Sequence, residues 1–215
     1  PLRRIEFDAN FGPFLRPPPA RILEIGFGNG ESLRYLAKLG YADLHGWDIS
    51  ADCVARAAAE DVPGSLRHVD GVAELHTGPA DAFDVIIAKD LLEHLPRESV
   101  VPFTSGLFRA LKPGGVFLAR LPNMANPLAV MLRYDDFTHT LGFTENSLRQ
   151  VFALGGFPRE SVRLAKDRLP AWPLLKSGLF ATFFREKCLG PVVRWTLDQA
   201  LLTQRKGPAA VSTLR

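Results

Sequence analysis

The stretch RILEIGFGNGESLRYLAKLGYADLHGWDIS, Arg21–Ser50, decides the fold that this sequence predicts. Its apolar start, 22–25, indicates a buried strand, and three alternating glycines follow. Apolar residues spaced i, i+3, i+4 then predict a helix over 32–39 with one buried face. A second strand ends on Asp48. A strand, glycine turn, helix and second strand make half of a nucleotide-binding α/β fold, which takes its ligand at the carboxyl ends of the strands.

The glycines and Asp48 have the chemistry of a nucleoside site. Glycine lets the backbone turn sharply and lets a ligand lie against it. A carboxylate at the end of the second strand can accept hydrogen bonds from both ribose hydroxyls. A dinucleotide fingerprint, G-x-G-x-x-G, needs a pyrophosphate at the helix N-terminus. Here Glu31 follows Gly30 directly, and its carboxylate would repel a pyrophosphate, so the spacing disfavours a nicotinamide cofactor.

The motif E-x-G-x-G-x-G at Glu24–Gly30 resembles the first motif of class I S-adenosylmethionine (SAM) methyltransferases. The resemblance implies that this loop cradles the amino-acid part of SAM, that Asp48 holds the ribose, and that Asp70 meets the adenine amine. The alternatives are a structural glycine turn in another α/β protein, and an ordinary turn residue at Asp70. The candidate cofactor contacts are Glu24, Gly26, Gly28, Gly30, Asp48, Asp70, Gly71 and Lys89.

A second informative block is DVIIAKDLLEHLP, Asp84–Pro96. Its apolar run predicts a strand that is buried on both faces of a parallel sheet. Glu93-His94-Leu95 resembles the acidic-His-Leu triplet that follows the fourth strand of the same methyltransferases. A helix is expected over 103–111, and the LKPGG turn leads into a fifth strand over 116–119. The alternation predicts an α/β, Rossmann-like class I methyltransferase fold with a mostly parallel seven-stranded sheet flanked by helices.

Shorter signals complete the core. Ser50 is expected to cap a helix over 51–60, and Thr144 to cap another over 145–154. A third strand is expected over 66–69. Upstream, the rings of Phe7, Phe11 and Phe14 fall at i, i+4 and i+7 and favour a short helix that packs on the core over the cofactor site.

The last quarter of the chain has a different composition. A sixth strand is expected over 161–165, a seventh strand or a helix face over 179–184, and a helix over 192–203. The sequence therefore divides into a SAM-binding core over 1–158, with a cap segment over 1–20, and a region over 159–215. That region holds the last strands of the sheet and a basic, aromatic-rich extension.

Charge is distributed unevenly over the 215 residues. Residues 1–158 hold 15 basic and 19 acidic side chains, whereas residues 159–215 hold 11 basic and 4 acidic ones. A basic tail on a slightly acidic body suggests an anionic partner, and a tail rich in aromatic and basic residues is compatible with an anionic membrane surface. Ordinary solvated charge is the alternative. Neither a secretory signal nor an apolar run of 18 residues occurs, so we expect a cytoplasmic protein with peripheral membrane contact through the tail.

Methyl transfer from a sulfonium is an in-line displacement, so the protein must chiefly align the two reactants. A hydroxyl acceptor must also lose its proton, which histidine is suited to accept. His94 and His139 follow the fourth and fifth strands, on the functional edge, and we favour His139 as the base because Asp135 and Asp136 are close enough in sequence to orient it. The two cysteines show no metal-ligand spacing, and we expect no metal site.

The sequence therefore predicts a SAM-dependent methyltransferase that methylates an oxygen of a sugar, a glycolipid or another small polar acceptor. The segment Pro122–Phe157, with its Asp-x-Thr-His element, resembles methyltransferases encoded with surface-polysaccharide and glycolipid pathways. A nucleic-acid methyltransferase is one alternative, although the fourth strand is not followed by the N-P-P-Y-like tetrapeptide common in enzymes that methylate base amines. A methyltransferase-like scaffold without turnover is the other.

Overall fold

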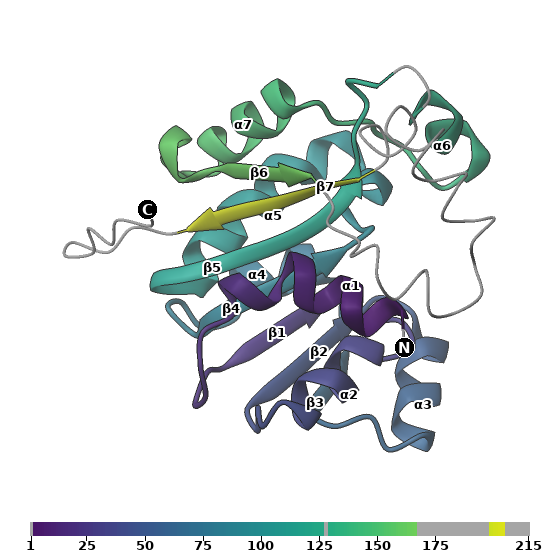
Figure 1. Ribbon diagram of the computed structural model, residues 1–215, viewed down its shortest axis with the longest axis vertical. Coiled ribbons are helices and arrows are strands. Elements are labelled where there is room, and N and C mark those ends of the chain that lie inside the picture. The colour runs from purple at the N-terminus through teal and green to yellow at the C-terminus, as the bar shows by residue number, and fades with distance from the viewer. Residues whose placement is uncertain (1, 127–128, 167–197, 205–215) are drawn as a thin grey trace.

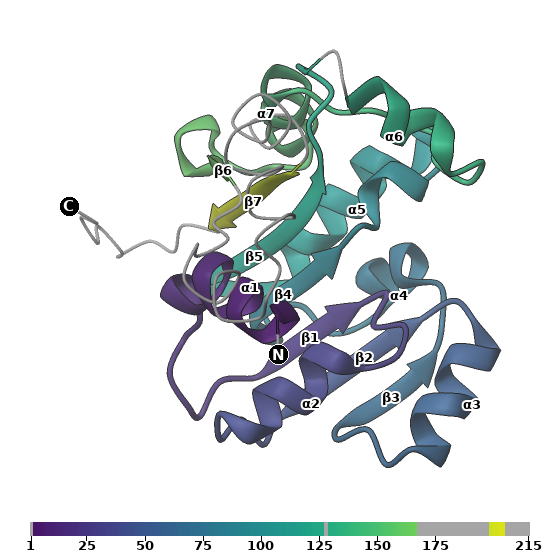
Figure 2. The ribbon, with the colours of Figure 1, turned by 45° about the vertical axis from the view of Figure 1, so that its right-hand side comes forward.

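The computed structural model describes residues 2–126, 129–166 and 198–204, which form a twisted sheet covered by helices (Figure 1). The sheet order is β3-β2-β1-β4-β5-β7-β6. Neighbouring strands from β3 to β5 are parallel, and β7 runs antiparallel to both β5 and β6. Figure 2 shows the arrows of β1, β2 and β4 pointing one way and β7 pointing the other. The strands are β1 Ile22–Ile25, β2 Leu44–Asp48, β3 Ser65–His68, β4 Phe83–Lys89, β5 Leu111–Pro122, β6 Arg163–Lys166 and β7 Asp198–Gln204.

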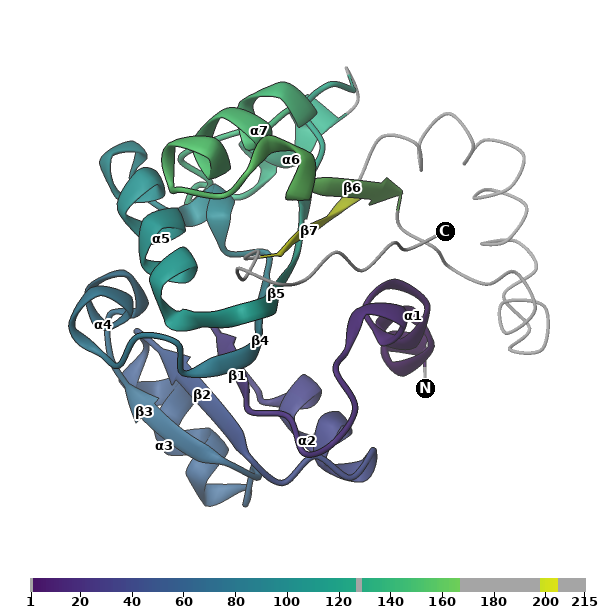
Figure 3. The ribbon, with the colours of Figure 1, turned by 90° about the vertical axis from the view of Figure 1, so that its left-hand side faces the viewer.

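Two apolar cores lie on opposite faces of the sheet, because successive residues of a strand point to opposite sides. In β4, Ile86 and Ala88 belong to the core on one face of the sheet. Val85 and Ile87 belong to the core on the other face. Figure 3 shows α4, α5 and α7 on one side and α1 and α2 on the other. The helices are α1 Leu2–Asn10, α2 Glu31–Lys38, α3 Ala51–Ala59, α4 Gly71–Thr77, α5 Arg97–Ala110, α6 Val130–Asp135 and α7 Glu145–Leu154.

Local capping explains where several helices begin. Ser50 Oγ accepts a hydrogen bond from the Cys53 N–H at 3.2 Å and starts α3. Thr144 and Ser147 form a reciprocal capping box at the start of α7. Both caps were predicted, because serine and threonine satisfy the backbone N–H groups of a first helical turn.

The N-terminal segment forms a helix that packs on the core, as predicted, but the helix ends at Asn10, before Phe11 and Phe14. Phe7 and Phe11 are buried, with their ring centroids 5.2 Å apart, and Phe7 also meets the Tyr35 ring of α2. A short 3₁₀ helix, η1 Gly12–Phe14, follows α1. Glu6 of α1 pairs with Arg120 near the carboxyl end of β5 at 2.6 Å. These contacts fasten α1 to the α2 side of the sheet.

The predicted mostly parallel sheet flanked by helices is confirmed, and several local expectations were wrong. The helix expected over 192–203 is contradicted at residues 198–203, which lie in β7 and pair antiparallel with β5. The 112–115 turn falls within β5, where the register jumps between β4 residues Phe83 and Val85. The prediction for 179–184 lies outside the described residues. No helix in the described ranges is long and apolar enough to cross a bilayer.

Candidate active site

The glycine loop after β1 needs glycine for two different reasons. Gly26, Gly28 and Gly30 have φ of 71°, 53° and 68°, in the left-handed region that favours glycine. A Cβ on Gly30 would lie 2.5 Å from Val62 Cγ1, whereas a Cβ on Gly28 would meet nothing within 4 Å. Gly30 therefore permits close packing at the start of α2, and Gly28 borders open space in which a ligand can lie.

This difference predicts different phenotypes for two alanine variants. Gly30→Ala should lose stability, because both the clash and the positive φ oppose folding. Gly28→Ala should cost only about 1–2 kcal/mol, the usual penalty for a left-handed residue. If the cofactor lies against Gly28, the Gly28→Ala variant should nevertheless bind SAM more weakly. Thermal unfolding with and without SAM measures both effects, and equal behaviour of the two variants would contradict this assignment.

Asp48 joins the end of β2 to the glycine loop. Its buried carboxylate accepts hydrogen bonds from the Gly28 N–H at 2.9 Å through Oδ2 and from the Ser50 N–H at 2.9 Å through Oδ1. A carboxylate oxygen has two lone pairs, so each retains one acceptor position. Asp48 can therefore hold the loop in shape and still accept a bond from a ribose hydroxyl.

Glu24 and Lys89 form a buried pair beneath this loop. Glu24 is 1% exposed, and its Oε1 lies 3.3 Å from Lys89 Nζ, which also donates to Ser32 Oγ of α2. Burial raises the pKa of the Glu24 carboxyl, and Lys89 opposes that shift. Within the described residues, Glu24 Oε2 has no hydrogen-bond partner. Lys89 is therefore the ion-pair partner of Glu24, and its expected contact with the cofactor stays a prediction.

Asp70 and Gly71 mark the carboxyl end of β3. Asp70 Oδ1 accepts a hydrogen bond from the Val72 N–H at 2.9 Å and caps α4, a helix that the sequence analysis missed. A Cβ on Gly71 would lie 2.7 Å from Ile25 Cγ2, so glycine allows α4 to approach β1. Both residues have structural roles, and their contacts with a cofactor stay a prediction.

The two candidate catalytic histidines, distant in sequence, lie side by side. His94 is in a 3₁₀ helix after β4, η2 Leu92–His94, and His139 follows β5 and α6. Their ring centroids are 4.6 Å apart. The Glu93 carbonyl joins the two segments by accepting from the Thr140 and Leu141 N–H groups at 2.8 and 3.1 Å.

The expectation that Asp135 or Asp136 orients His139 was wrong. His139 Nδ1 lies 2.7 Å from the Leu132 carbonyl oxygen, which fixes the ring. Asp136 instead accepts from the Thr138 hydroxyl at 2.6 Å, and that hydroxyl lies 2.9 Å from His94 Nδ1. Hydrogen bonds from Thr138 lower the pKa of Asp136. Sequence proximity could not reveal this, because helix α6, also unpredicted, supplies the carbonyl.

The strand order separates two halves of one functional edge. From β1 the chain proceeds outward to β2 and β3, then returns to β4 beside β1 and proceeds to β5. Ligands of open α/β sheets bind at such a reversal, at the carboxyl ends of the strands. The glycine loop, Asp48 and Asp70 follow β1, β2 and β3, and the histidine pair follows β4 and β5.

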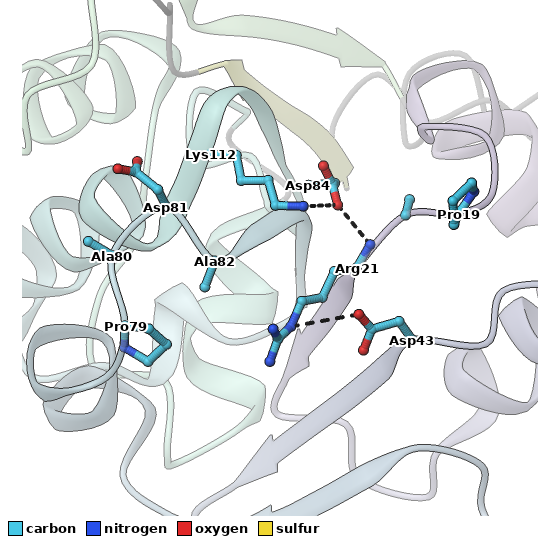
Figure 4. Close-up of a pocket in the computed structure, with 10 residues that line it drawn as sticks. Pro19, Arg21, Asp43, Pro79, Ala80, Asp81, Ala82, Asp84 and Lys112 are labelled. Atoms are coloured by element: carbon cyan, nitrogen blue, oxygen red, sulfur yellow. Dashed lines mark hydrogen bonds and ion pairs between the residues drawn. The ribbon is translucent and has the colours of Figure 1, made fainter.

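A cavity of about 380 Å³ lies at the opposite edge of the sheet, lined by residues that include Arg21, Asp43 and Lys112 (Figure 4). These residues are at or near the amino ends of the parallel strands. There Asp84 Oδ2 accepts from the Arg21 N–H at 2.8 Å and from Lys112 Nζ at 2.7 Å. Its position makes this cavity a part of the scaffold rather than of the candidate active site.

Comparisons with known proteins agree with this geometry. Residues 22–115 match the family model described as a methyltransferase domain. The chain is similar to a ubiquinone biosynthesis O-methyltransferase of Paramagnetospirillum magneticum, with 32% identity over 56% of this chain and 49% of that protein. It is also similar to a 2-methyl-6-phytyl-1,4-hydroquinone methyltransferase of Synechocystis sp., with 31% identity over 55% of this chain and 37% of that protein. The chain thus matches about half or less of these curated relatives.

Among solved structures, an S-adenosylmethionine-dependent methyltransferase from Mesorhizobium loti superimposes with a TM-score of 0.73. The alignment covers 94% of this chain and 98% of that chain at 17% identity, which compares the folds alone. The fold and the family match therefore agree on one conclusion. Residues 22–115 match a methyltransferase-domain family model, and the chain has the fold of the SAM-dependent methyltransferases.

Proposed function

We propose that this protein is a SAM-dependent methyltransferase that transfers the methyl group to an oxygen of a small-molecule acceptor. SAM lies at the carboxyl ends of β1, β2 and β3, with its amino-acid part against the glycine loop and its ribose at Asp48. The acceptor lies at the ends of β4 and β5, beside His94 and His139. The observation that carries the proposal is the bond between Asp48 and the Gly28 N–H, because it shapes the loop while each carboxylate oxygen keeps one acceptor position.

The cofactor assignment has further support in the chemistry of the loop. The buried Glu24 Oε2, two residues before Gly26, is an acceptor without a partner in the described residues, and a cationic ligand group nearby would favour its ionised form. Glu31 begins α2 in the position where a dinucleotide would need its pyrophosphate. SAM brings no phosphate to that helix end, and so the carboxylate carries no penalty.

His139 is the proposed base that removes the proton from the acceptor hydroxyl. Its Nδ1 is held by the Leu132 carbonyl, which can only accept, so Nδ1 carries the proton and Nε2 is left bare. A bare nitrogen is what proton removal from a hydroxyl requires. His94 lies against the same ring and contributes to the wall of the acceptor site.

The proposed acceptor is a small molecule with a hydroxyl group. The two curated relatives are named for quinone and hydroquinone chemistry, which favours a small molecule with a hydroxyl group. Sugars and glycolipids, favoured by the sequence resemblance, belong to the same proposal. A nucleic acid is disfavoured, because residues 1–158 are net acidic.

The experiment is a methyl-transfer assay with radiolabelled SAM against hydroquinones, catechols, sugars and glycolipids. His139→Gln should lower kcat by about 100-fold or more, the usual contribution of a general base, with SAM affinity unchanged. His76→Gln is the matched control, since His76 of α4 lies far from the site and its Nε2 is 2.8 Å from the Pro102 carbonyl oxygen of α5. SAM binding without transfer to any acceptor class would favour the scaffold alternative.

A further inference from the structure

We propose that Glu93, His94 and His139 form a binding site for a divalent transition-metal ion. One ligand atom from each residue lies within 4.8 Å of the other two. Glu93 is buried, and both histidines are partly buried. Two of the residues come from η2 and the third from the segment after α6, so the fold itself assembles the cluster. No metal site was expected from the sequence, because the two cysteines show no metal-ligand spacing and His139 lies far from Glu93 and His94 along the chain.

The hydrogen bonds of the two rings give independent support. The Thr138 hydroxyl donates its only hydrogen to Asp136, so its oxygen accepts from His94 and Nδ1 of His94 carries the proton. The Leu132 carbonyl fixes the same tautomer in His139. Both rings therefore have a bare Nε2. A histidine that binds a metal normally donates its other ring N–H to a carbonyl, carboxylate or similar acceptor, as both do here.

The donor set selects the kind of ion. Two imidazoles and one carboxylate suit Zn²⁺, Fe²⁺ or Mn²⁺, whereas Ca²⁺ and Mg²⁺ prefer oxygen ligands throughout. Zinc bonds of about 2.0–2.2 Å require the three atoms to move closer by side-chain rotation. The backbone needs no rearrangement, because the Glu93 carbonyl already ties its segment to Thr140 and Leu141.

Three protein ligands leave a coordination position open, which is the arrangement of catalytic rather than structural zinc sites. An acceptor oxygen would occupy this position, a role that rests on the proposed function. With the ion bound, both Nε2 atoms are ligands. The base role of His139 then applies to the ion-free protein only.

The test is titration of the chelator-treated full chain with Co²⁺, followed by its visible absorption, and with Zn²⁺ by calorimetry, both without SAM. One equivalent of each ion should bind. His139→Gln should weaken binding by at least about 100-fold. Thr138→Val, which removes the hydroxyl that holds His94, should weaken it by about 10-fold, the lower end for an outer-shell partner. His76→Gln should bind the ions as the unaltered protein does.

Each outcome bears on one proposal. The absence of saturable binding, or an unchanged dissociation constant in His139→Gln, overturns the metal site. Because Glu93 is buried, Glu93→Gln is informative only if thermal unfolding shows that the variant is folded. His139 and Thr138 are less buried, and their variants test the metal site without Glu93→Gln. Failure of SAM binding with normal Co²⁺ binding overturns the proposed function and leaves the metal site standing.

Discussion

Asp48→Asn should weaken SAM binding by roughly 100-fold while the protein stays folded. The neutral amide keeps one oxygen and replaces the other with an NH₂ group. One of the two hydrogen bonds, from the Gly28 N–H or from the Ser50 N–H, is therefore lost. It also removes the charge that strengthens bonds to ribose hydroxyls. Hydrogen bonds to a charged group contribute about 1.5–3 kcal/mol each, and about 1.4 kcal/mol corresponds to tenfold in affinity. Calorimetric titration with SAM and with S-adenosylhomocysteine measures the loss.

Asp43→Asn is the matched control for that variant. Asp43 precedes the same strand at the opposite edge, where its carboxylate lies 2.8 Å from His45 and 3.9 Å from Arg21. It is exposed, and its loss should leave SAM affinity within about twofold, as expected for an exposed ion pair. A dissociation constant for Asp48→Asn within threefold of the unaltered protein would contradict the assignment of Asp48.

Lys89→Met should destabilise the protein by about 3 kcal/mol at pH 7, because it leaves the buried Glu24 charge without its partner. This is the lower end of the usual range, since the Lys89 side chain is 26% exposed. Chemical denaturation at pH 7 and at pH 5 measures the change. The double variant Glu24→Gln/Lys89→Met should recover much of the loss, because it removes both charges.

The pH dependence of this variant has a definite sign. Burial raises the folded pKa of Glu24 above its ordinary value of 4.5, so the folded state binds the proton more tightly than the unfolded state. Glu24 therefore lowers stability as pH rises from about 4.5 through the raised folded pKa. Removing Lys89 raises that pKa further. The deficit of Lys89→Met should shrink at pH 5, and an equal deficit at both pH values would contradict the account.

The core of the fold was predictable because its signals are local. The apolar run of β4 and the glycines after β1 report the backbone conformation directly. Ser50 and Thr144 likewise report their helix starts through their own side chains. The helix predicted over 192–203 was wrong for the converse reason. Strand β7 is determined by its pairing with β5, a non-local contact that apolar periodicity does not encode.

The sequence predicted which residues lie at the candidate site, but not the hydrogen bonds that they form. The position of Asp48 after β2 followed from the motif, whereas its bond to the Gly28 N–H depends on how the loop folds back. Lys89 was predicted as a cofactor contact, and only the structure shows its Nζ beside Glu24. The partner of His139 comes from α6, a short helix without a clear apolar pattern.

The most direct test of the central claim is calorimetric titration of the unaltered protein with SAM, S-adenosylhomocysteine and NADH. The account predicts saturable binding of the two sulfur ligands with one site per chain, and no binding of NADH. Binding of NADH, or no binding of either sulfur ligand, would contradict the claim that the glycine loop and Asp48 hold SAM.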